Sequence, residues 1–136
     1  MSTSIEYQAG YCNIGSEEKR LRRRAGYFGL IISLIGILLI LFLKIDPIFS
    51  ILLFFPIYLT VIGFYQAKSN FCVYFGFSGL YDMEEKAREI RKVQDDIKRK
   101  TDRKKALKMS LIALMITIIS TLIIFGIVYE LNILNL

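Results

Sequence analysis

The sequence predicts an all-α integral membrane protein with three transmembrane helices. Of its 136 residues, 54% are hydrophobic, which exceeds the share of about 45–50% that is usual for soluble domains. The apolar residues gather into three blocks without Asp, Glu, Lys or Arg, at 25–43, 47–67 and 109–129. At a rise of about 1.5 Å per residue, a helix of each block crosses a hydrocarbon layer of about 30 Å. All charged residues therefore lie outside the blocks.

The first two blocks are expected to form an antiparallel hairpin. Only residues 44–46 separate them, and Pro47 is suited to the first turn of the second helix. Pro56 lies in the middle of the second block and cannot donate a hydrogen bond to the Leu52 carbonyl, so we expect a kink there. The first block is too long for the apolar core of a signal peptide, and the chain returns to the membrane directly after it.

A long charged helix is expected before the third block. Asp82 and Glu85 have the spacing of a capping box, and no Gly or Pro follows them before Gly126. We therefore expect a basic cytoplasmic helix at 83–108 that continues into the span at 109–129. The other expected segments are an N-terminal juxtamembrane segment at 1–24, an outer turn at 44–46, an interfacial aromatic and glycine-containing segment at 68–82, and an outer tail at 130–136.

The apolar face of this charged helix is too short for a coiled coil. Its apolar residues Met83, Ile90, Val93 and Ile97 have heptad spacing, but lysines interrupt the pattern. The helix is therefore expected to contact a partner or the membrane surface along one side. Its positive and negative charges are interspersed and no aromatic residues lie between them, so nucleic acid binding is not expected.

The distribution of basic residues predicts the orientation. Seventeen of the eighteen Lys and Arg residues lie in 1–24 and 68–108, and only Lys44 lies at the other side of the spans. By the positive-inside rule, the N-terminus lies inside and the C-terminus outside the cytoplasmic membrane. The basic residues beside the spans are expected to contact anionic lipid headgroups rather than a specific anion. They are Lys19, Arg20, Arg22, Arg23, Arg24, Arg103, Lys104, Lys105 and Lys108.

Two stripes of small residues predict how the helices pack. Both have the spacing i, i+3, i+7, i+10, and each begins two residues after a basic residue. The stripes are Gly26, Gly29, Ser33 and Gly36 in the first span and Ser110, Ala113, Thr117 and Ser120 in the third. If both helices cross from inside to outside, the stripes lie at the same depth and are expected to face each other. The alternative is that either stripe contacts another subunit.

Cys12 and Cys72 are expected on the same side of the membrane, because the hairpin lies between them. Three interpretations are open: two packed thiols, a disulfide or redox pair, and a soft-metal site such as copper(I), which two thiolates alone can hold. The chain has no His and no CxxC motif, which favours packing over a metal site.

The composition argues against an enzyme. There is no His and no Trp, and no carboxylate lies inside an apolar block to relay protons or bind a substrate. We therefore expect no catalytic residue, no cofactor and no small-molecule substrate.

The two segments that flank the hairpin share a recognisable pattern of cysteine, glycine, aromatic and basic residues. It is carried by Cys12, Asn13, Ile14, Gly15, Glu17, Arg22, Arg23, Arg24 and Gly26, and by Gln66, Ala67, Phe71, Cys72, Phe75, Gly76 and Gly79. This pattern, over residues 11–80, resembles an uncharacterised family of small prokaryotic membrane proteins. The resemblance implies a two-span hairpin with paired cysteines and carries no activity.

The expected function is that of a non-catalytic accessory subunit of a larger membrane complex, of the respiratory or membrane monooxygenase type. Its partners would be other membrane subunits and anionic lipid headgroups. An alternative is a thiol-based redox or copper-handling membrane protein that uses Cys12 and Cys72. A third interpretation is a polybasic tether to a lipid surface.

Overall fold

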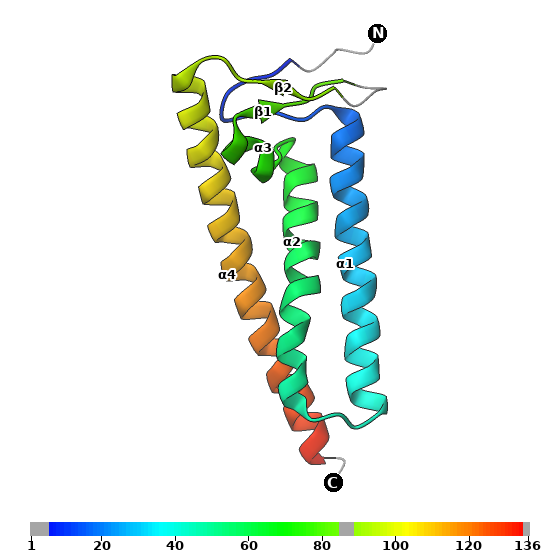
Figure 1. The fold of residues 1–136 in the computed structure, drawn as a ribbon. Coiled ribbons are helices and arrows are strands. Elements are labelled where there is room, and N and C mark those ends of the chain that lie inside the picture. The colour runs from blue at the N-terminus through cyan, green and yellow to red at the C-terminus, as the bar shows by residue number, and fades with distance from the viewer. Residues whose placement is uncertain (1–5, 85–88, 135–136) are drawn as a thin grey trace.

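The protein is mostly helical, with three long helices and a small cap of short elements at one end (Figure 1). The structure is a computed structural model that describes residues 6–84 and 89–134. In chain order the elements are α1 (Ser16–Phe42), the 3₁₀-helix η1 (Pro47–Leu53), α2 (Phe54–Ser69), α3 (Val73–Ser78), β1 (Leu80–Tyr81), β2 (Arg91–Lys92) and α4 (Asp96–Leu134). The two strands pair in antiparallel fashion. We call the end with α3 and the strands the charged end, and the opposite end the turn end.

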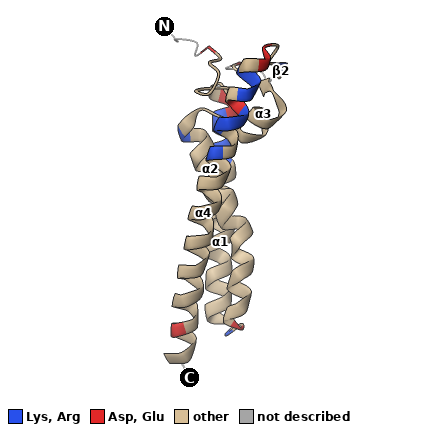
Figure 2. Ribbon diagram, turned by 90° about the vertical axis from the view of Figure 1, so that its left-hand side faces the viewer, with Lys and Arg blue, Asp and Glu red and all other residues tan. Residues whose placement is uncertain are grey.

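Three helical stretches are long and apolar enough to cross a membrane: Ser16–Phe42, Pro47–Ser69 and Asp96–Leu134. Figure 2 shows that Lys and Arg gather at the charged end, whereas the helices beyond it carry almost no charge. These features confirm the predicted helical fold with three apolar helices, and they are consistent with a multi-pass membrane protein.

α1 and α2 run in opposite directions and approach each other closely through glycines (Figure 1). A Cβ at Gly29 would lie 2.7 Å from the carbonyl oxygen of Pro56, and one at Gly63 would lie 2.6 Å from the main-chain nitrogen of Gly26. Both distances are too short for carbon, so only glycine lets the two backbones meet at these points. The contact therefore fixes how α1 and α2 lie against each other.

The expected contact between the two small-residue stripes is wrong, because α2 lies between α1 and α4 (Figure 1). The stripe of α1 faces the second span: Gly26 lies against the ring of Phe64, and Gly36 lies against the side chain of Leu53. The short connection at 44–46 places the second span directly beside α1. Helical spacing revealed which face of α1 packs, but not which helix it packs on.

The other residues of the two stripes are buried or half-buried. In α1, Ser33 is buried and its hydroxyl donates a hydrogen bond of 2.8 Å to the Gly29 carbonyl. In α4, Ala113 and Thr117 are buried on the face that packs on the neighbouring elements. Ser110 and Ser120 are half-buried at the margins of that face.

α4 packs on the second span at the turn end and on the cap at the charged end. At the turn end, Val128 belongs to an apolar cluster with Ile40, Leu53 and Ile57. At the charged end, Ala106 and Met109 surround the buried ring of Phe71. The two ends of α4 are therefore held by separate clusters.

The second span begins as a 3₁₀-helix, and Pro56 lies close to the start of its α-helical part. Asp46 caps η1 by accepting a hydrogen bond of 3.0 Å from the amide of Ile48. The α-helix starts at Phe54, so Pro56 occupies its first turn, where a missing amide donor breaks no helical hydrogen bond. In place of the kink expected at Pro56, the span changes from a 3₁₀-helix to an α-helix at Phe54, just before the proline.

The expected charged helix at 83–108 is wrong over the described residues 83–84 and 89–95, because α4 begins only at Asp96 and Arg91–Lys92 is a strand. The reason is that Asp82 does not cap a helix. Its side chain accepts hydrogen bonds from the amides of Glu84 and Glu89, at 3.1 and 2.9 Å. The amide of Val93 donates to the Gly79 carbonyl at 2.8 Å, which holds the chain extended.

The heptad residues of that expected helix accordingly share no face. Val93 is buried, whereas Ile90 and Ile97 are exposed. Glu85, the second residue of the expected capping box, lies outside the described residues.

Candidate functional site

The candidate site is the cap, which we define as residues 6–15, 70–84 and 89–102 at the charged end. The N-terminal segment lies between two later parts of the chain and pairs with both. The Asn13 amide donates to the Asn70 carbonyl at 3.1 Å, and the Asp82 amide donates to the Asn13 carbonyl at 2.9 Å. The Gly15 amide then donates to the Asp82 carbonyl at 2.7 Å. This segment therefore joins the start of α1 to the chain on both sides of α3.

Two buried amide side chains reinforce this arrangement. The side chain of Asn13 binds both main-chain groups of Cys72: Oδ1 accepts from the amide at 2.6 Å, and Nδ2 donates to the carbonyl at 3.1 Å. Gln66, near the end of α2, accepts from the Val73 amide at 2.8 Å. Buried amides are stable only with hydrogen-bond partners, and here the main chain supplies them.

Asp82 and Asp102 are two carboxylates buried in the cap. Asp82 holds the amides of Glu84 and Glu89, as described above. Asp102, which lies on α4, accepts from the Tyr7 hydroxyl at 2.5 Å and from the Gly10 amide at 2.8 Å. Burial and the neighbouring Asp102 carboxylate raise the pKa of Tyr7 far above its usual value, so the phenol stays protonated. Asp102 therefore ties the start of α4 to the N-terminal segment.

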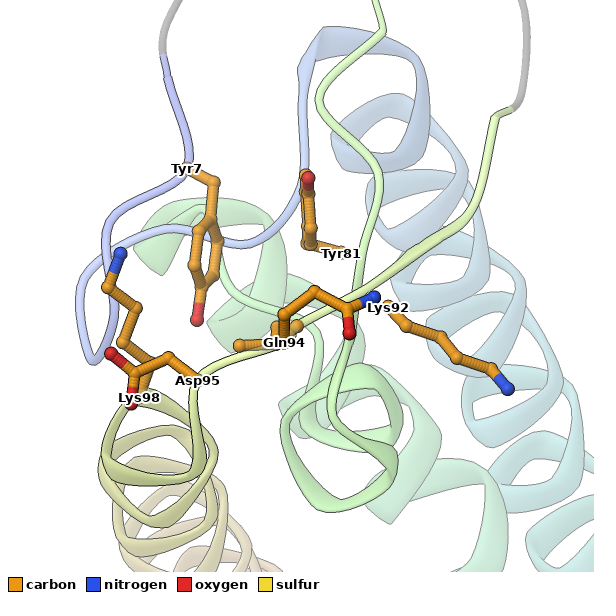
Figure 3. A pocket seen from close by; sticks show the side chains of 7 residues that line it. Tyr7, Tyr81, Lys92, Gln94, Asp95 and Lys98 are labelled. Carbon is orange, nitrogen blue, oxygen red and sulfur yellow. The ribbon is translucent and has the colours of Figure 1, made fainter.

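A cavity of about 230 Å³ opens beside Tyr7 (Figure 3). The rings of Tyr7 and Tyr81 stack with their centroids 4.6 Å apart at one side of it. The remaining lining residues are Lys92, Val93, Gln94, Asp95 and Lys98. Both lysines are exposed, and Asp95 accepts a hydrogen bond of 2.8 Å from the amide of Ile97 at the start of α4. The cavity is thus a polar recess at the surface. Its carboxylate, that of Asp95, is engaged in a hydrogen bond with the start of α4.

The cap brings the segments of both cysteines together without joining the two thiols. Cys12 is 8% exposed, and its thiol lies 3.1 Å from the Glu6 carbonyl oxygen. Cys72 is fully buried in an apolar cluster with Ile14 and Phe75. Both cysteines are free thiols. Among residues 6–84 and 89–134, no three Cys, Asp or Glu side chains come close enough together to hold a metal ion.

The basic residues expected at lipid headgroups differ in how far they are exposed. Arg22 turns into the protein, where it pairs with the buried Glu18 at 3.2 Å and lies 5.8 Å from the ring centre of Phe75. Arg20 pairs with Glu17 at 2.7 Å on the surface. Lys19 and Lys105 are half-buried, and the others are exposed: Arg23, Arg24, Arg103, Lys104 and Lys108.

Three structural roles could not be predicted from the sequence. Tyr7 and Asp102 are separated by 95 positions, and Asp102 lies within a basic run that is typical of an exposed helix face. Asn13 stands out in the sequence only as part of the pattern that begins at Cys12. Glu18 gave one usable signal, because Arg22 follows it at i,i+4 spacing, which places both residues on one face of α1.

No protein-family model, curated protein or solved structure matches this chain. The resemblance described for residues 11–80 therefore remains a prediction, and the function has to be inferred from the fold and the cap.

Proposed function

We propose that this chain is a non-catalytic accessory subunit that stabilises or assembles a larger membrane complex, of the respiratory or membrane monooxygenase type. One observation carries the proposal: the buried polar side chains of the cap and of the adjoining end of α2 are used to fix the backbone. Asn13, Gln66 and Asp82 each bind main-chain amides or carbonyls. At catalytic sites such groups are instead aimed at a cleft with shifted pKa values.

A second feature supports contact with a partner in the membrane. The face of α4 opposite its buried one is apolar and exposed over Met115, Ile119 and Leu122. Gly126 continues this face, and a Cβ built there would meet no atom within 4 Å. A glycine on an open helix face lets the backbone of another helix approach closely. We infer that this face of α4 receives a helix of a partner subunit.

The proposed location is the cytoplasmic membrane, with the cap inside and the end of α4 outside. The gathering of Lys and Arg at the charged end supports this orientation. In this orientation the cap lies on the cytoplasmic side of the membrane.

The experiment is a native purification in mild detergent, in which mass spectrometry identifies co-purifying subunits and a metal assay is run on the same sample. We expect constant large subunits in stoichiometric amounts. Gly126→Leu should lower their recovery by about tenfold, which corresponds to about 1.4 kcal/mol of lost packing, without lowering the unfolding temperature of the isolated chain. The matched control is Ile127→Leu at the exposed neighbour. A chain that purifies alone from its native membrane as a stable monomer or homodimer would overturn the proposal.

The alternative function, thiol redox or copper handling through Cys12 and Cys72, is less well supported. Reactive cysteines are accessible and lie in electropositive surroundings, whereas Cys72 is fully buried in an apolar cluster. The burial of both thiols supports a packing role, and the labelling experiment in the Discussion separates the two functions.

A further inference from the structure

An apolar groove lies between α2 and α4. The two helices pack together at the turn end and diverge towards the charged end, where α3 and Phe71 fill the space between them (Figure 1). Between these two contacts lies a groove of about 440 Å³. It is lined by Val61, Phe64, Tyr65, Lys68, Ile112 and Ile116. Its volume falls within the range of about 300–1,000 Å³ that is typical of small-molecule sites.

The groove is apolar along its length and basic at one end. Lys68 lies in the last turn of α2 and is exposed at the charged end of the groove. Lys108, also exposed, lies one helical turn from Ile112 on the same face of α4. Lys68 therefore lines the groove near the charged end, where a membrane-spanning protein meets the headgroup layer, and Lys108 lies one turn of α4 beyond the lining residue Ile112.

We propose that this groove binds one anionic phospholipid of the leaflet beside the cap. An acyl chain would lie along the apolar walls formed by Phe64, Ile112 and Ile116. The phosphate group would lie between Lys68 and Lys108, where its charge is opposite to theirs. The chain would thus hold a specific lipid in addition to the general attraction between its exposed basic residues and the membrane surface.

The shape and charge of the groove favour a lipid over a partner helix. A transmembrane helix is about 10–12 Å across with its side chains, whereas this groove lies between the α2–α4 contact at the turn end and the Phe71 cluster at the charged end. A partner helix would also cover Lys68 without supplying a counter-charge, which is costly in an apolar environment. A phospholipid matches both the apolar walls and the basic end.

The test measures lipid retention by the isolated full-length chain, using native mass spectrometry with two probes of identical acyl chains. The probes are dioleoyl phosphatidylglycerol and dioleoyl phosphatidylcholine. We expect one retained phosphatidylglycerol and a clear preference over phosphatidylcholine. Lys68→Gln and Lys108→Gln should each lower that preference by about fivefold, the effect of one lysine near a membrane surface. Lys44→Gln, at the turn end, is the control and should leave it unchanged.

A second pair of variants tests the apolar walls. Ile116→Trp places a larger side chain in the groove and should reduce retention of both lipids, whereas Ile119→Trp, outside the groove, should not. Both positions are 45% or more exposed, so neither change should prevent folding. Equal retention of the two probes, or displacement by glycerol phosphate alone, would overturn the lipid site, as would crosslinking of position 116 to a partner helix. Because the assay uses the isolated chain, its outcome is independent of whether an accessory role is correct.

Discussion

The Asn13 side chain binds the main chain of Cys72 as a neighbouring β-strand would, by accepting from its amide at 2.6 Å and donating to its carbonyl at 3.1 Å. The two residues are 59 positions apart. The contact joins the segment that leads into α1 to the segment that links α2 with α3. A single side chain thus supplies the pair of hydrogen bonds that a residue of a neighbouring strand would make.

Replacing Asn13 should destabilise the cap strongly. Asn13→Ala removes both hydrogen bonds and leaves two buried main-chain groups of Cys72 without these partners, at a cost of about 2–4 kcal/mol. Asn13→Asp keeps the acceptor but sets a buried carboxylate oxygen against the Cys72 carbonyl, so it should not restore the stability. The measurement is the unfolding temperature in detergent. Asn132→Ala is the matched control, because the side-chain hydrogen bond of Asn132 to the Ile45 carbonyl is long at 3.4 Å. Equal losses for Asn13→Ala and Asn132→Ala would contradict the role of this contact.

The stability of the cap should depend on the protonation of Tyr7. The pKa of Tyr7 is raised by burial and by Asp102, so the folded state holds the phenol proton more tightly than the unfolded state. The stabilisation is therefore complete below about pH 10, the ordinary value for tyrosine, and decreases as the pH rises above it.

The check on Tyr7 is a series of unfolding measurements between pH 7 and pH 11. Tyr7→Phe should cost about 1–3 kcal/mol at neutral pH, because it removes a partner of the buried Asp102, and it should lose less stability than the wild type above pH 10. Tyr11→Phe, at an exposed tyrosine, should behave as the wild type does. A Tyr7→Phe profile parallel to the wild type would count against the raised pKa.

The two thiols should react slowly in the folded protein. Alkylation of Cys72 should be slower than that of Cys12, because Cys72 is 0% and Cys12 is 8% exposed, and both should react rapidly in denaturant. Cys72→Ser should cost about 1–3 kcal/mol, because it introduces a hydroxyl into an apolar cluster. Fast labelling of both thiols in the native state, together with loss of function in the double Ser variant, would instead support thiol chemistry.

The glycines between α1 and α2 should not tolerate alanine. A Cβ at Gly29 would meet the Pro56 carbonyl oxygen at 2.7 Å and the Thr60 amide nitrogen at 2.8 Å. Gly29→Ala should therefore force the helices apart and cost about 1–3 kcal/mol. Gly126→Ala is the matched control in an open position and should stabilise the helix by about 0.5–1 kcal/mol. Thermal unfolding of both variants in one detergent decides between packing and helix propensity, since propensity alone favours alanine at both positions.

Part of this fold could be predicted from the sequence. The three spans could, because a long apolar block without charges has few other structures available to it. The face of α1 that carries Gly26 and Gly29 could also be recognised, because helical spacing identifies a face. The helix that this face contacts could not, because spacing along one helix contains no information about its neighbour.

The cap was beyond prediction for a related reason. Asp82 and the residues after it have local signals for a helix, but Asp82 pairs with Asn13 and Gly15, which are distant in sequence, and Val93 pairs with Gly79. Tertiary contacts of this kind override local propensity. Asp102 gave no local sign of burial, since its neighbours in sequence are basic and its partners are Tyr7 and Gly10.

The position of the N-terminal segment has a consequence for the order of assembly. Residues 7–15 are synthesised before their partners, which are Asn70, Cys72, Asp82 and finally Asp102. The segment therefore has to wait for its contacts until α1, α2 and the start of α4 have been synthesised. An early part of the chain is then among the last to find its native contacts, so a change that delays the docking of residues 7–15 would slow the completion of the cap.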